Sequence, residues 1–139
     1  MDRSGDWLRQ AERDLESARL ISRGGFYEWA CFISQQAAEK AAKALCESHR
    51  VMTRTHQLTR LFQAVKELEE IPDDLYEKAV SLDRYYIPTR YPNGFESGAP
   101  MEYFFQKDAQ EAISHAAEII KFCSHKVAKQ GNADTKAED

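Results

Sequence analysis

The chain has 139 residues, of which 42% are hydrophobic and 30% charged, and its formal net charge is −4 at pH 7. This length suits one domain with one core, and the apolar runs are too short to cross a bilayer. The negative charge argues against a protein that coats nucleic acid without specificity. Three cysteines, an odd number, lie inside helical patterns, so we expect reduced, buried thiols in a cytoplasmic protein.

Apolar residues recur at intervals of three and four along most of the chain, which predicts amphipathic helices. We expect five helices, over about residues 6–23, 27–49, 56–68, 75–86 and 102–126. Thr55 is predicted to cap the third of them. Because short turns join most of these helices, we expect an all-α fold, an antiparallel up-and-down four-helix bundle with an additional short helix. Residues 1–128 should form this domain, and residues 129–139, which are nearly free of apolar side chains, a disordered tail.

The segment 82–95 concentrates three tyrosines, two arginines, two prolines and a glycine in fourteen residues. Guanidinium groups match phosphate oxygens, and tyrosine rings stack on bases. This composition predicts a nucleotide site in which Arg90 binds phosphate, Tyr85 or Tyr91 stacks on the base, and Arg84 adds positive charge. The alternative is that the tyrosines only anchor a long loop onto the helices.

A basic stretch precedes this loop in the sequence. Between positions 40 and 66 there are six Lys or Arg residues, two histidines and one acid. His56 is expected at the start of a helix, where an anion is favoured, so it is a candidate phosphate ligand or proton-transfer group. Lys43 could join the same positive surface, although a packed His56 and a solvated Lys43 are the simpler interpretations. Since there is no Cys-x-x-Cys or His-Glu-x-x-His motif, we expect no metal site, and no cofactor other than a bound nucleotide such as ATP.

Four segments resemble the HEPN family, the small helical domains named for higher eukaryotes and prokaryotes nucleotide-binding. They are Trp7-x3-Ala11, Gly25-x-Tyr27-x-x-Ala30-Cys31-Phe32-x3-Gln36-Ala37-Ala38-Glu39-Lys40-Ala41, Thr55-His56-x-Leu58 and Leu82-Asp83-x-Tyr85-Tyr86-Ile87-Pro88-Thr89-Arg90-Tyr91-Pro92. The resemblance covers nearly the whole chain. It implies a homodimer, association with a minimal nucleotidyltransferase, and either nucleotide binding or metal-independent ribonuclease activity of the toxin type.

The ribonuclease branch of the family carries an arginine followed after four to six residues by a histidine. The corresponding arginine is Arg90, and the positions for histidine hold Phe95, Glu96 and Ser97. This departure favours a dimeric nucleotide-binding module that acts with a nucleotidyltransferase, for which RNA is a second ligand to consider. A ribonuclease toxin would need His56, contributed across the dimer, as its catalytic residue. A third hypothesis is an assembly or antitoxin scaffold without catalytic activity.

Overall fold

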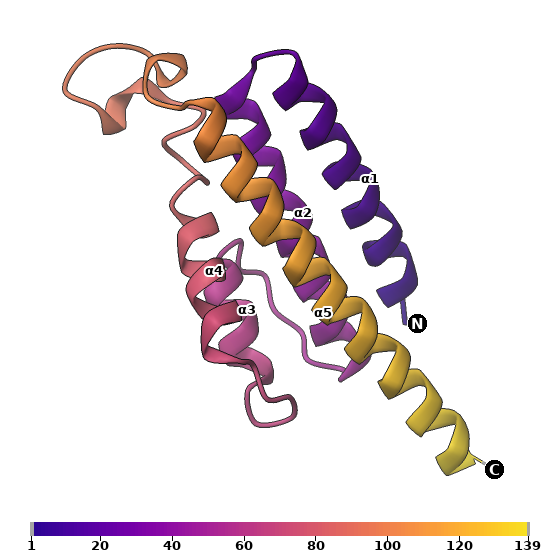
Figure 1. Ribbon diagram of the computed structural model, residues 1–139. Helices are drawn as coiled ribbons and strands as arrows, with labels where there is room; N and C mark the ends of the chain where they lie inside the picture. The colour runs from indigo at the N-terminus through magenta and orange to yellow at the C-terminus, as the bar shows by residue number, and fades with distance from the viewer. Residues whose placement is uncertain (1, 139) are drawn as a thin grey trace.

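The computed structural model describes residues 2–138, which form a bundle of α-helices joined by turns and one long loop (Figure 1). In chain order the elements are α1 (Ser4–Arg23), α2 (Tyr27–Ser48), α3 (Leu58–Val65), α4 (Asp73–Asp83), the 3-10 turns η1 (Pro92–Gly94) and η2 (Pro100–Glu102), and α5 (Gln106–Glu138). Within the described residues there is no strand. The helices α1, α2, α4 and α5 alternate in direction, and the short α3 lies beside α4 (Figure 1). The predicted all-α fold, a four-helix bundle with an additional short helix, is confirmed.

The second helix is the centre of the bundle, because it contacts α1, α3, α4 and α5. Half of its twelve buried residues are alanine, and small side chains allow neighbouring helix backbones to approach closely. The buried alanines of α2 are Ala30, Ala37, Ala38, Ala41, Ala42 and Ala44. Larger side chains from α3, α4 and α5, such as Phe62, Leu82 and Ile119, complete the core. Burial of this apolar surface is the main favourable contribution to folding.

The cysteines are free and buried, as the sequence predicted. Burial raises the pKa of the Cys31 thiol to about 12 and that of the Cys46 thiol to about 11. Their thiolates are therefore scarce at neutral pH, and these residues are packing groups of the core.

Two helices end in the same hydrogen-bonded motif but with different residues. After α1, Gly25 has φ 87°, Gly25 N donates to Ser22 O at 3.0 Å, and Phe26 N donates to Ile21 O at 3.2 Å. After α2 the equivalent position is Arg50, with φ 60° and the same pair of bonds to the last turn of the helix, each 2.9 Å long. Glycine is usual at this position, since a left-handed conformation costs other residues roughly 1–2 kcal/mol. Arg50 is the only non-glycine residue with positive φ in the described part of the chain.

The connection between α2 and α3 runs back along α2 toward its start (Figure 1). It brings His56 beside Glu39 of α2, at 3.4 Å between His56 Nδ1 and Glu39 Oε1. The Asp83 carboxylate, at the end of α4, then holds the first turn of α3. It accepts hydrogen bonds from Leu58 N at 2.8 Å and from Thr59 N and Oγ1 at 3.0 and 2.9 Å. A cap from another helix thus fixes where α3 begins.

Several predicted boundaries are corrected by the structure. Gln57 rather than Thr55 is the N-cap residue of α3, and Thr55 Oγ1 accepts a hydrogen bond from Gln57 N instead. The third helix ends at Val65 instead of residue 68, and the fourth at Asp83 instead of residue 86. The last helix begins at Gln106 and continues through Glu138, so helix is found where a disordered tail was expected from residue 129. The helix formers Ala128, Lys129 and Gln130 allow α5 to continue past Val127, which packs against the core. The division into a domain and a tail stays a prediction.

Candidate functional site

Arg90 is surrounded by aromatic rings. Its Cζ atom lies 4.4 Å from the ring centroid of Phe32, 4.7 Å from that of Tyr86 and 5.1 Å from that of Tyr91. Its Nε donates a 2.9 Å hydrogen bond to the carbonyl oxygen of Tyr86. Within residues 2–138 the guanidinium has no carboxylate partner, and its two Nη groups donate to no acceptor. The side chain is therefore positioned by π-systems, with most of its donors unused.

The turn that follows α4 places Arg90 over these rings. Thr89, which is buried, donates its hydroxyl hydrogen bond to the carbonyl oxygen of Tyr85, and Arg90 N donates to Ile87 O at 3.1 Å. Pro88 lacks an amide hydrogen and prevents α4 from continuing through this segment. The helix therefore ends before this segment, and Arg90 lies against Tyr86 and against Phe32 of α2.

His56 adjoins one of these rings, that of Tyr86. Its imidazole lies parallel to Tyr86, with 5.7 Å between the ring centroids and an interplanar angle of 12°. The partner of its Nδ1 is Glu39, whose side chain is only 4% exposed and also contacts Lys43 Nζ at 3.2 Å. Glu39 Oε1 accepts no hydrogen bond within the described residues, so the 3.4 Å approach of His56 is an electrostatic contact. With Nδ1 facing the carboxylate, Nε2 is the imidazole nitrogen that is left for a ligand.

A buried amide fixes the backbone of His56. Gln35 Nε2 donates to His56 O at 3.2 Å and to Asp83 Oδ1 at 3.4 Å, while Gln35 Oε1 accepts from Gln36 Nε2 at 2.7 Å. Gln35 is completely buried. Its amide joins α2 to the start of α3 and the end of α4, and so sets the distance between His56 and the loop that carries Arg90.

We call Arg90, Phe32, Tyr86, Tyr91 and His56 the Arg90 cluster. Three of the residues predicted from the sequence as nucleotide ligands, Arg90, Tyr91 and His56, meet in it. Lys43 is joined to the cluster through Glu39, and it also lies over the Trp7 ring, at 5.6 Å from Nζ to the centroid.

Two further predicted ligands lie elsewhere. Tyr85 packs against Phe104, with 5.9 Å between centroids and an interplanar angle of 72°, and burial raises its pKa to about 12. Its neighbour Tyr86 occupies the place in the cluster that Tyr85 was expected to take. Arg84 is exposed and has no ion pair in the described residues. The three tyrosines therefore differ in their contacts, since Tyr85 anchors the loop while Tyr86 and Tyr91 contact Arg90.

Sequence reasoning missed Phe32, Glu39 and Tyr86. A signal was present, because Phe32, Gln36, Glu39 and Lys43 follow one another at intervals of four, three and four along α2. Such intervals place side chains on one face of a helix. On α2 this face carries an aromatic ring, an amide and one charged pair instead of the alanines of the buried side.

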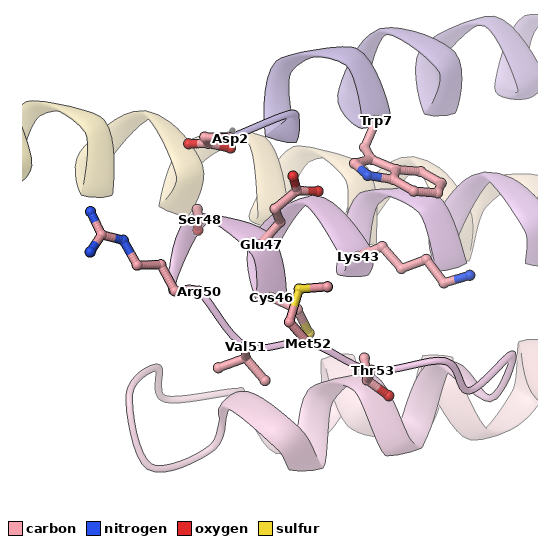
Figure 2. Close-up of a pocket in the computed structure, with 10 residues that line it drawn as sticks. All are labelled: Asp2, Trp7, Lys43, Cys46, Glu47, Ser48, Arg50, Val51, Met52 and Thr53. Atoms are coloured by element: carbon pink, nitrogen blue, oxygen red, sulfur yellow. The ribbon is translucent and has the colours of Figure 1, made fainter.

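A cavity of about 740 Å³ lies beyond Lys43, between the start of α1, the end of α2 and the connection that follows it (Figure 2). Trp7 and Lys43 lie on one side and Arg50 on the other, with Glu47 between them (Figure 2). Asp2 and Met52 also line the cavity. Hydrogen bonds from the side chain and backbone of Ser4 lower the pKa of Asp2.

The sequence matches the HEPN domain family over residues 4–127, nearly the whole chain. It is 28% identical over 124 residues to a candidate toxin of Methanocaldococcus jannaschii named MJ1304, and the match spans 83% of this chain and 82% of the relative. The helical architecture and the family match both agree with the HEPN resemblance that the four sequence segments indicated. The chain belongs to the HEPN family.

Solved structures give the same result. The fold is similar to that of TT1696 from Thermus thermophilus, with a TM-score of 0.88 and 39% identity over 91% of this chain and 99% of that one. It is also similar to ST0689, an archaeal HEPN homologue, with a TM-score of 0.78 and 42% identity over 91% and 99% of the two chains. An HEPN domain protein of Thermotoga maritima aligns with a TM-score of 0.72 and 31% identity over 88% and 98%. In the described part of the chain, no helix combines the length and the apolar character that a membrane span requires.

Proposed function

We propose that this HEPN protein binds the phosphate of a nucleotide at the Arg90 cluster. We further propose that it works in the cytoplasm as a homodimer with a minimal nucleotidyltransferase partner, in a system of the toxin–antitoxin type. The name of the Methanocaldococcus relative, a candidate toxin, and membership of the HEPN family support the second part. Co-purification tests the partnership. If a nucleotidyltransferase encoded beside this chain does not co-purify with it, the partnership is contradicted.

The observation that carries the first part is the unpaired guanidinium of Arg90. A half-buried arginine normally has a carboxylate or several carbonyl oxygens as acceptors, since unpaired buried charge is costly. Here one carbonyl oxygen is the acceptor, and three rings hold the plane of the group. An incoming phosphate would supply the acceptors, and the exposed ring of Tyr91 offers a stacking surface for a base.

The test is a calorimetric titration of ATP into the full chain. We expect saturable micromolar binding, weakened about 10- to 100-fold in Arg90→Ala, because hydrogen bonds between charged groups are lost. Arg19→Ala is the matched control, since it removes one guanidinium from an exposed position of α1 that has no ion pair in residues 2–138. Arg84→Ala and Lys43→Ala then measure whether these two predicted ligands contribute.

Equal ATP affinity of wild type and Arg90→Ala would remove Arg90 from the site. Absence of heat in every variant would contradict binding of a free nucleotide.

A second candidate function, ribonuclease activity of the toxin type, is favoured by the Glu39–His56 contact. A carboxylate that faces Nδ1 fixes the orientation of the imidazole, which suits a general acid or base. Arg90, which contacts the same Tyr86 ring, would then stabilise charge on the phosphate under attack.

A further inference from the structure

The cavity beside Trp7 is connected to the Arg90 cluster by an unbroken row of side chains. From Arg90 the contacts run through Tyr86, His56, Glu39 and Lys43 to the Trp7 ring, which lines the cavity. On α2 the row follows the face defined by Phe32, Glu39 and Lys43. Phe32 and Lys43 are eleven positions apart, which corresponds to about 16 Å along the helix axis.

The chemistry of the two ends differs. The Arg90 end offers unused guanidinium donors. The cavity contains an indole ring, the thioether of Met52, which is 89% exposed, and the carboxylates of Asp2 and Glu47. Glu47 Oε1 already accepts a 2.8 Å hydrogen bond from Arg3 N, and the lowered pKa of Asp2 keeps that group ionised. These carboxylates can accept hydrogen bonds from the exocyclic amino group of a base, which the apolar surfaces can sandwich.

Arg50 gives a second reason to regard the cavity as a binding site. At the end of α1 the left-handed position of the motif is Gly25, which adopts that conformation without strain. At the end of α2 the chain instead has a long charged side chain in the left-handed conformation, at the border of the cavity. Strained residues of this kind concentrate at functional sites. A guanidinium at this border would contact the phosphate beside a bound base.

From these observations we infer that the cavity is a base subsite of the nucleotide site, and that the ligand is a short single-stranded oligonucleotide lying along α2. One phosphate binds at Arg90, and a base further along the strand stacks on Trp7, with an adjacent phosphate at Arg50. This inference rests on the proposed phosphate site at Arg90. A single nucleoside triphosphate fits less well, because the buried Glu39 carboxylate lies in the middle of the row and disfavours three consecutive phosphates. In an oligonucleotide the phosphates are separated by sugars.

The test is a competition assay in which a fluorescently labelled oligoadenylate is bound to the full chain. Unlabelled ATP and an unlabelled tetranucleotide of adenylate are then compared by the affinity with which each displaces the probe. We expect the tetranucleotide to bind at least about tenfold more tightly than ATP, as one additional stacked base contributes roughly that factor. Trp7→Leu, which retains an apolar side chain, should lower tetranucleotide affinity to the level of ATP. Arg50→Gly, which removes the strained side chain without loss of the helix end, should weaken the tetranucleotide and leave ATP binding unchanged.

Other outcomes separate the failure of this inference from the failure of the site itself. If ATP and the tetranucleotide bind equally and neither cavity variant has an effect, while Arg90→Ala still abolishes binding, the base subsite is wrong and the Arg90 site stands. If Trp7→Leu weakens ATP as much as the tetranucleotide, one triphosphate spans the row and the oligonucleotide is excluded. If neither ligand binds wild type, both proposals fail.

Discussion

At the scale of single residues, the proposed function depends on the different contacts that two side chains make. Arg90 has aromatic neighbours and free donors, whereas His56 has one ring nitrogen facing a buried carboxylate. Arg90 is therefore suited to hold a phosphate, and His56 to exchange a proton with it. Phosphate binding by Arg90 is sufficient for a binding module, whereas proton exchange by His56 is what an enzyme would need in addition.

If the protein cleaves RNA, His56→Ala should reduce cleavage by about 10²- to 10⁴-fold, the usual contribution of a general acid or base. The measurement is the rate at which a labelled single-stranded RNA is degraded in the presence of EDTA. His125→Ala is the matched control, because His125 is an exposed histidine of α5. Cleavage that is unchanged in His56→Ala would eliminate the ribonuclease hypothesis for this residue.

At the scale of elements, three helices meet at Asp83. Its carboxylate caps α3 from the end of α4, and Gln35 of α2 donates to it from inside the core. The site depends on this junction, since Gln35 also holds the backbone of His56.

Asp83→Ala should lower the free energy of unfolding by about 2 kcal/mol, since it removes a helix cap and leaves buried donors unpaired. Denaturant unfolding measures this, with Glu77→Ala, an exposed acid of α4, as the control. ATP affinity should fall with Asp83→Ala, because His56 loses its fixed position. Stability equal to that of the control would show that the cap contributes nothing.

The helices were predictable, and the contacts between them were not. Periodicity located all five helices, because apolar spacing reports directly which face is buried. Thr55 was a plausible cap by local rules, yet the carboxylate that holds α3 comes from Asp83, 25 residues after Leu58. In the same way Glu39 and His56 are 17 positions apart, and only the return of the chain along α2 brings them together. Local rules also gave no reason to choose Tyr86 over Tyr85.

At the scale of the whole molecule, several large apolar side chains remain exposed at one end of the bundle. Phe26, Trp29, Ile87, Met101 and Phe105 are each more than 40% exposed, and they belong to segments that meet at the end where α2 and α5 begin (Figure 1). Exposed apolar groups that gather in this way are typical of protein interfaces. This end is therefore where we expect the contact of the proposed homodimer.

Light scattering should give the mass of a dimer for wild type and the mass of a monomer for Met101→Asp or Phe105→Asp. Leu68→Asp is the control, as Leu68 is 56% exposed but follows α3, away from this end. Arg90→Ala should remain dimeric, and its dissociation would favour the scaffold hypothesis over nucleotide binding. A monomeric wild type would contradict the homodimer altogether.

The placement of the tryptophans has a practical consequence. The chain contains two, and they lie at opposite ends of the row of side chains on α2. Trp29 is 6.1 Å from Phe32, the ring beneath Arg90, while Trp7 lies at the cavity. Their indole fluorescence is therefore a pair of native optical reporters. With Trp29→Phe the emission comes from Trp7 alone, and with Trp7→Phe from Trp29 alone, so occupancy of each end can be followed separately without an attached dye.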